Sequence, residues 1–169
     1  MSARTVYENA PLGSLIRYAD GTPRPPARFK KKLAAWETRN GAGRLVGKEP
    51  ARDRPNGISP ASFTLHEGDF GNGGVVVLTV RRIYSLDSDL RFEIVGRPAI
   101  GAVRILQEYG DNAELLHLAQ SHEAAERWLT QHRYSNVRLN EVTEDEVGAD
   151  VVAGRAALPS VRSTVPVNL

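Results

Sequence analysis

Residues 75–84 read Val-Val-Val-Leu-Thr-Val-Arg-Arg-Ile-Tyr, and this stretch decides the fold class. It is rich in β-branched residues and long enough for a central strand. Further strands are expected on both sides of it, mostly separated by short turns, and such strands predict an antiparallel meander. Their expected ranges are 62–66, 90–95, 103–106, 115–118 and 136–142, with short candidates at 15–18 and 44–46.

A basic N-terminal helix is predicted over residues 26–39. Pro26 suits its first turn, where the N–H that proline lacks would have no partner. Phe29, Leu33 and Trp36 share one face by their spacing, so we expect that face to dock on the sheet and Trp36 to join the core.

Two C-terminal helices are predicted after the sheet. Ser121 is the expected N-cap of the first, and Ala125, Trp128, Leu129 and His132 form its inner stripe. A second, shorter helix starts after the capping box Thr143-Glu144-Asp145-Glu146 and runs to about Gly154.

The sequence therefore predicts an α+β fold: a mainly antiparallel sheet of about five or six strands, two C-terminal helices and a basic N-terminal helix. The pattern does not favour a doubly wound parallel sheet, because the central strands do not alternate with helices. We expect a flexible N-terminal arm over 1–25, a basic helix and Gly/Pro-rich loop over 26–60, an α+β core over 61–155 and a tail over 156–169.

The composition excludes several classes of chemistry. The chain has no cysteine, which rules out disulfides, thiolate zinc sites, iron–sulfur clusters and cysteine nucleophiles. The longest apolar run, Val75 to Leu78, falls far short of the ~18 residues of a membrane span. No apolar block of a signal peptide lies between Met1 and Leu15. We expect a cytoplasmic protein that does not contact membranes.

Charge is divided unevenly along the chain. Residues 1–60 carry 12 Lys/Arg and 5 Asp/Glu, a net charge of +7, whereas residues 61–169 carry 10 Lys/Arg and 15 Asp/Glu, a net charge of −5. This asymmetry favours a basic element that meets a polyanion, carried on an acidic scaffold. The alternative is that the two parts neutralise each other in the fold.

The basic residues of the N-terminal helix and its flanks form the candidate nucleic-acid-binding site. Such a set of cations suits a row of phosphates and carries affinity without sequence specificity. We therefore predict a non-enzymatic nucleic-acid-binding accessory or regulatory protein, with DNA and RNA both open. A merely solvated helix face is the competing interpretation. The candidate residues are Arg24, Arg28, Lys31, Lys32, Arg39, Arg44 and Lys48.

The alternative function is a small inhibitor or adaptor that binds another protein. In that hypothesis the acidic residues of the sheet domain, Asp87, Asp89 and Glu144 to Glu146, face a basic partner or mimic a polyanion.

Catalytic patterns are incomplete. The run Gly41 to Glu49 resembles a phosphate-binding loop, but Ala42 replaces its first glycine and Glu49 its Ser/Thr. No two histidines have the i, i+4 spacing of a helical metal site. His66 and Asp69 could act as a general base or weak metal site, although a polar strand end is the simpler interpretation. We predict no catalytic residue, metal or cofactor.

Overall fold

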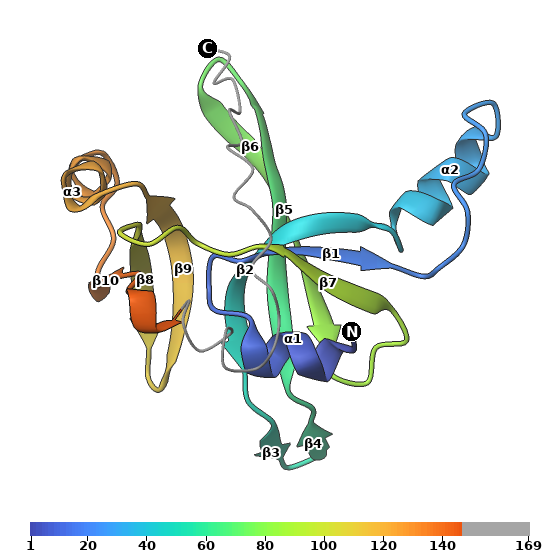
Figure 1. The fold of residues 1–169 in the computed structure, drawn as a ribbon, viewed down its shortest axis with the longest axis horizontal. Coiled ribbons are helices and arrows are strands. Elements are labelled where there is room, and N and C mark those ends of the chain that lie inside the picture. Colours follow the sequence, from blue (N-terminus) through green and yellow to red (C-terminus); the bar gives the residue numbers. More distant parts are fainter. Residues whose placement is uncertain (147–169) are drawn as a thin grey trace.

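The computed structural model describes residues 1–146 of the 169-residue chain (Figure 1). Residues 144–146 form a helical turn where the helix after Thr143 was predicted. The rest of that helix and the tail over 156–169 lie outside the described residues.

The fold is α+β, with a main antiparallel sheet of eight strands, somewhat more than predicted. A separate two-stranded hairpin contains β3 (Arg52–Arg54) and β4 (Gly57–Ser59). The strands of the main sheet are β1 (Leu15–Ala19), β2 (Gly41–Glu49), β5 (Ser62–Asn72), β6 (Val75–Ser85), β7 (Arg91–Gly96), β8 (Val103–Tyr109), β9 (Asn112–Ala119) and β10 (Val137–Glu141).

Strand β2 joins the two halves of the sheet. The strand order is β10-β8-β9-β2-β1-β7, and β5 branches from β2 to pair with β6. One edge of β2 pairs with β1 and, near its end, with β9 through the pair Gly47 and Glu114, whereas the opposite edge pairs with β5. The sheet is therefore not the simple meander that the spacing predicts, because distant segments pair through β2.

The Gly/Pro-rich loop expected up to residue 60 is corrected: the short strand candidate at 44–46 lies within the longer β2, and β3 and β4 form a hairpin. The glycines of β2 permit close packing. A Cβ atom at Gly41 would lie 2.6 Å from the Tyr18 hydroxyl oxygen, and one at Gly43 would lie 2.9 Å from the Leu65 Cβ. Glycine in a strand often marks such a close approach.

The N-terminal residues, expected to be mobile, form helix α1 (Ala3–Asn9). The Ser2 hydroxyl caps it by accepting the Thr5 N–H. Ala3 and Val6 are fully buried and pack on the sheet core. That core includes Ile16, Tyr18, Leu45, Phe63, Leu65 and Phe92.

Helix α3 (His122–Gln131) covers the other half of the sheet, as the sequence predicts. Its N-cap is Ser121, whose hydroxyl accepts the Ala124 N–H. Ala125 is buried against β8 and β9, and Trp128 and Leu129 pack around it. Of the helices in residues 1–146, none is long and apolar enough to cross a membrane.

The β5–β6 hairpin extends beyond the sheet (Figure 1). Its two strands pair up to a tight turn at Gly73 and Gly74, whose φ angles are +62° and +79°. Glycine adopts such angles without strain. Near this turn the apolar side chains of β6 are exposed, and Val77 is 77% accessible.

Helix α2 (Lys30–Glu37) corresponds to the predicted basic helix but does not dock on the sheet. It stands away from the body between β1 and β2 (Figure 1), and within the described chain none of its residues is buried. The prediction that Trp36 joins the core is therefore wrong. The indole N–H of Trp36 instead donates to the Thr22 carbonyl oxygen at 2.9 Å, so the helix packs on its own preceding loop.

Candidate functional site

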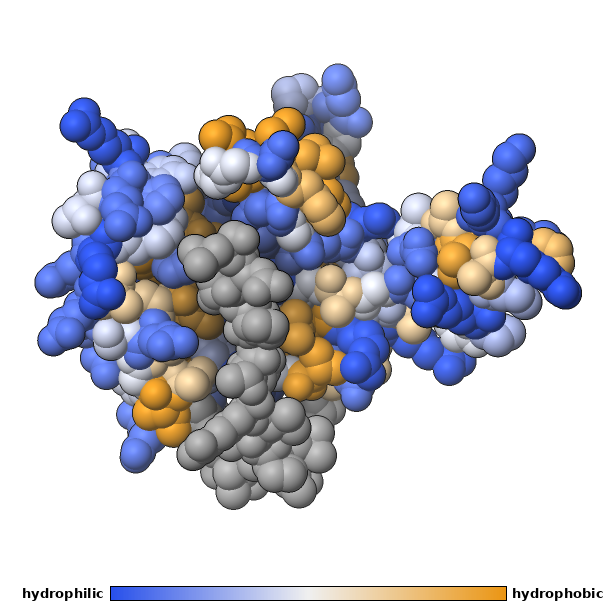
Figure 2. Space-filling model, turned by 90° about the horizontal axis from the view of Figure 1, so that it is seen from above, coloured by the Kyte–Doolittle hydropathy of each residue, from blue (hydrophilic) through white to orange (hydrophobic). Residues whose placement is uncertain are grey.

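Residues 22–40, here called the basic protrusion, carry the exposed cations of α2 (Figure 2). Arg24 lies 3.6 Å from Glu37 and 5.9 Å from the centre of the Trp36 ring. Arg28 and Lys32 lie over the exposed Phe29 ring, at 4.8 Å and 5.5 Å. Among residues 1–146, no carboxylate is within ion-pair distance of Arg28 or of Lys30 to Lys32.

The base of the basic protrusion is fixed by ion pairs and hydrogen bonds. Arg39 lies 3.4 Å from Asp20 and 2.6 Å from Asp89. Hydrogen bonds from Thr22, aided by Asn40 and the charge of Arg39, lower the pKa of Asp20 to about 2. Arg39 therefore anchors the base of the protrusion to Asp20 and Asp89.

A second anchor comes from β6. Arg82 donates to the Thr38 carbonyl oxygen at 2.6 Å and to Glu67 at 3.0 Å. Glu67 also accepts the Tyr18 hydroxyl, and burial together with this bond raises the pKa of Tyr18. The end of α2 is thereby tied to the sheet.

The two remaining candidate cations lie on β2, away from the tip of the protrusion. Lys48 donates to the Tyr7 carbonyl oxygen at 2.5 Å, and burial lowers its pKa. Arg44 donates to the Gly13 carbonyl oxygen at 2.7 Å and lines a cleft. The seven candidate residues therefore do not form one surface: Arg24, Arg28, Lys31 and Lys32 share the protrusion, Arg39 anchors it, and Arg44 and Lys48 lie elsewhere.

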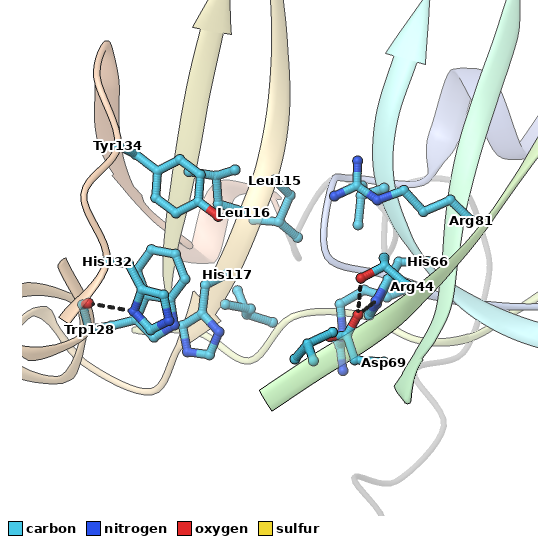
Figure 3. A pocket seen from close by; sticks show the side chains of 14 residues that line it. Arg44, His66, Asp69, Arg81, Leu115, Leu116, His117, Trp128, His132 and Tyr134 are labelled. Atoms are coloured by element: carbon cyan, nitrogen blue, oxygen red, sulfur yellow. Dashed lines mark hydrogen bonds and ion pairs between the residues drawn. The ribbon is translucent and has the colours of Figure 1, made fainter. Parts of the chain in front are cut away.

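The cleft at Arg44 has a volume of about 570 Å³ and separates the β5–β6 hairpin from β9 and α3. This volume is within the usual range of small-molecule sites. Figure 3 shows aromatic side chains on one wall and charged side chains on the other.

The aromatic wall contains four nearly parallel rings, here called the aromatic shelf: His117, Trp128, His132 and Tyr134. Trp128 is central, with ring-centre distances of 5.1 Å to His117, 4.0 Å to His132 and 5.7 Å to Tyr134 and interplanar angles of at most 11°. His132 Nδ1 lies 2.9 Å from the Trp128 carbonyl oxygen, which can only accept, so Nδ1 carries a proton. His117, His132 and Tyr134 are exposed, whereas Trp128 is half-buried.

The opposite wall contains a row of basic groups. Strand register pairs Arg44 with His66 and His66 with Arg81, so the three side chains lie side by side on one face of β2, β5 and β6. Arg81 also donates to Glu114.

Asp69 is the carboxylate that lines this wall. It lies 2.9 Å from His66 Nε2 and accepts the Thr79 hydroxyl at 2.7 Å. These bonds lower the pKa of Asp69, so it is ionised and hydrogen-bonded at neutral pH. Its two partners hold it against the wall.

His117 on the aromatic shelf has a lowered pKa. The main cause is desolvation of the ring by the surrounding protein, even though part of the side chain is accessible, and the charges of His132 and Arg44 add to it. His117 is therefore neutral at pH 7, and its ring is suited to stacking on an uncharged aromatic group.

His66 and Asp69 are in contact, but within residues 1–146 no group of three His, Asp or Glu side chains is arranged to hold a metal ion. The acidic residues of the alternative hypothesis are partly engaged: Asp89 pairs with Arg39, and Glu146 with the buried Arg104 at 2.6 Å.

The aromatic shelf is the feature that sequence reasoning missed. The i, i+4 spacing of Trp128 and His132 does place them together on α3. However, the end of α3 turns the chain back so that Tyr134 meets Trp128, and strand pairing brings His117 in from β9. Neither contact has a local sequence signal.

Comparisons with known proteins identify the family. No curated protein and no solved structure matches the chain. A sequence profile of a family described as "Uncharacterised conserved protein UCP036055" matches residues 1–146, which are also the residues that the structure describes. The chain therefore belongs to the uncharacterised conserved protein family UCP036055.

Proposed function

We propose that this protein is a non-enzymatic, cytoplasmic nucleic-acid-binding accessory protein that contacts phosphates through its basic protrusion. The observation that carries the proposal is the exposure of α2: its cations stand away from the body, and in the described part of the chain Arg28 and Lys30 to Lys32 meet no carboxylate. Cations without internal partners can neutralise phosphates. The counterions condensed on the nucleic acid are then released, and this release favours binding.

The neighbouring aromatic side chains support the same function. Arg28 and Lys32 cover Phe29, which is 43% exposed. An exposed ring between cations suits single-stranded nucleic acid, because a base can stack where the adjacent phosphates are neutralised. A protein partner with an acidic surface would need the cations but not the ring.

The anchored base makes the protrusion a defined surface. Arg39 and Arg82 hold its C-terminal end, and Trp36 holds α2 to the preceding loop. The loss of conformational freedom on binding is smaller for such a segment than for a disordered tail.

The experiment is a fluorescence anisotropy titration of labelled single-stranded DNA, single-stranded RNA and duplex DNA with the purified full chain at several salt concentrations. The proposal predicts a linear fall of log affinity with log salt, with a slope of about −0.7 per phosphate contact on single strands. Absence of binding to all three ligands at low salt contradicts it. The ranking of the ligands identifies the preferred nucleic acid.

The exposed β5–β6 hairpin supports a second candidate function, binding of a protein partner. Four consecutive residues of β6, Val75 to Leu78, are each more than half exposed, and Phe70 is 59% exposed. Figure 2, seen from above the hairpin, shows apolar side chains gathered on this side of the molecule. Exposed apolar patches commonly mark protein interaction surfaces. Pull-downs with wild type and Val77→Lys test it: a partner recovered equally by both contradicts docking on the hairpin.

A further inference from the structure

The cleft between the β5–β6 hairpin and α3 combines two features that a nucleotide needs. One wall is the aromatic shelf, and the other carries the guanidinium groups of Arg44 and Arg81 (Figure 3). We infer that the cleft binds one nucleotide, with its base stacked on the aromatic shelf and its phosphate at Arg44 and Arg81. This inference deepens the proposed function and rests on it for the claim that the bound polymer is single-stranded.

The geometry of the aromatic shelf supports stacking of a base. The rings are seen face-on in Figure 3, so their edges point across the cleft toward the opposite wall. A base stacked parallel to these rings therefore turns one edge toward Arg44 and Arg81. The shelf has accessible rings for this purpose, because Tyr134 is 47% exposed and His117 is also exposed. Stacking on aromatic side chains accepts every base.

The charged wall supports a phosphate. Arg44, His66 and Arg81 form one row across three paired strands. Arg44 is held by its bond to the Gly13 carbonyl oxygen, which orients the guanidinium before a ligand arrives. Arg81 pairs with Glu114 and can also contact a second anion, because a guanidinium has five N–H donors. Asp69 is the opposing charge in the cleft, and its bonds to His66 and Thr79 hold it.

The position of the cleft fits a strand that also contacts the basic protrusion. The protrusion ends at Asn40, and Arg44 lies four residues further along β2. At about 3.3 Å per residue, Asn40 at the base of the protrusion and Arg44 are about 13 Å apart along the strand, and the cations of α2 lie further out (Figure 1). A flexible single strand that contacts both must therefore extend from the cations of α2, past the base of the protrusion, to the cleft. In duplex DNA the bases are paired and stacked, so they are not available to the shelf.

The ligand chemistry is a nucleotide, and its source is either a free mononucleotide or a residue within a strand. The test uses Trp128 fluorescence in a Trp36→Phe background, because the chain has two tryptophans and this substitution leaves Trp128 alone. The probes are adenosine 5′-monophosphate, a 12-nucleotide single strand and the corresponding duplex. Ribose 5-phosphate is the control ligand that has the phosphate and lacks the base.

We expect saturable quenching by adenosine 5′-monophosphate and none by ribose 5-phosphate. Quenching by the single strand and not by the duplex identifies the strand as the source, whereas quenching by the mononucleotide alone identifies the free nucleotide. Equal quenching by ribose 5-phosphate, or no quenching by either nucleotide ligand, overturns the inference.

Two variants test the shelf without removing Trp128, which contributes to the core. Tyr134→Ala removes an exposed ring, and about tenfold weaker nucleotide binding is expected from the loss of one stacking contact. Tyr134→Phe keeps the ring and retains binding within about twofold. Equal binding by Tyr134→Ala and wild type contradicts the inference.

The failure of this inference is separable from the failure of the proposed function. Free mononucleotide binding does not require the basic protrusion, so a variant with neutral residues at Arg28 and Lys30 to Lys32 still shows quenching if the cleft is a nucleotide site. Conversely, a protein that binds oligonucleotides in a salt-dependent way without quenching of Trp128 supports the basic protrusion and overturns the cleft.

Discussion

Trp128 and His132 stack with their ring centres 4.0 Å apart and their planes 11° apart, while His132 Nδ1 bonds to the Trp128 carbonyl oxygen at 2.9 Å. The hydrogen bond fixes the histidine ring at the end of α3, and the ring in turn covers the indole. Trp128 thereby connects the apolar core under α3 with the open cleft.

The two tryptophans are expected to differ in their effect on stability. Trp128→Ala removes a half-buried ring from the core under α3 and is expected to destabilise the fold by about 2–4 kcal/mol. Trp36→Ala is the matched control, with a cost of about 1 kcal/mol or less, because no residue of α2 within the described chain is buried. Urea unfolding measures both, and equal losses would contradict this view of the two sites.

Substitutions at two glycines of β2 are also expected to differ in their effect on stability. Gly41→Ala places a Cβ atom 2.6 Å from the Tyr18 hydroxyl oxygen and is expected to cost about 1–3 kcal/mol. Gly47→Ala is the control, because its Cβ atom has its nearest neighbour at 4.0 Å. In thermal unfolding, Gly41→Ala should have a clearly lower melting temperature than Gly47→Ala. The reverse order would refute the packing argument.

These glycines also show how far the sequence could lead. The β-branched stretch 75–84 and the stretches expected at 62–66, 90–95, 103–106, 115–118 and 136–142 predict six strands of the sheet, all of which are present. Strand β2 is predicted only as a short candidate at 44–46, because it contains Gly41, Gly43 and Gly47, and glycine is depleted in strands in general. The need for glycine there comes from Tyr18 and Leu65, residues of other strands, so no local pattern could reveal it.

The basic helix illustrates a second limit. The spacing of Phe29, Leu33 and Trp36 correctly predicts a helix, and α2 forms within the predicted range, although Phe29 is its N-cap and is 43% exposed. Periodicity does not say what covers the face that these residues share. The preceding loop provides this contact through Thr22, and the helix therefore remains outside the core. The aromatic shelf was out of reach for a similar reason, since strand pairing assembles it.

The buried Arg104 is expected to be a major contributor to stability. It is 4% exposed and donates to the Leu12 carbonyl oxygen, to Asn140 and to Glu146. Arg104→Ala leaves these acceptors without their donor, and we expect a loss of about 3 kcal/mol. Arg138, whose pair with Glu108 is about half exposed, is the control, with an expected loss below about 1 kcal/mol for Arg138→Ala. Similar losses in urea unfolding would contradict the assignment.

The lowered pKa of His117 predicts a dependence of stability on pH. In the unfolded chain this histidine titrates near its ordinary pKa of 6.5, whereas in the folded protein it takes up a proton only at lower pH. The unfolded state therefore binds more protons as the pH falls below about 6.5, and the folded state loses stability there. Well above pH 6.5, His117 is neutral in both states, so its titration no longer lowers the stability of the folded state.

His117→Gln removes that titration and keeps a polar side chain. Between pH 7.5 and pH 5.5, wild type is expected to lose more of its free energy of unfolding than His117→Gln does. Parallel losses in the two proteins would show that His117 titrates alike in the folded and unfolded states.

The central claim, that the basic protrusion binds nucleic acid, is tested most directly by the salt dependence of single-strand binding in a charge variant. The variant replaces Arg28, Lys30, Lys31 and Lys32 by glutamine, and the control replaces Arg4, Arg17, Arg52 and Arg54, which are exposed outside the protrusion. The account predicts that the first variant binds at least about tenfold more weakly, with a salt slope shallower by about 2–3, while the control stays close to wild type. An unchanged slope in the first variant, or an equal change in both, would contradict the claim.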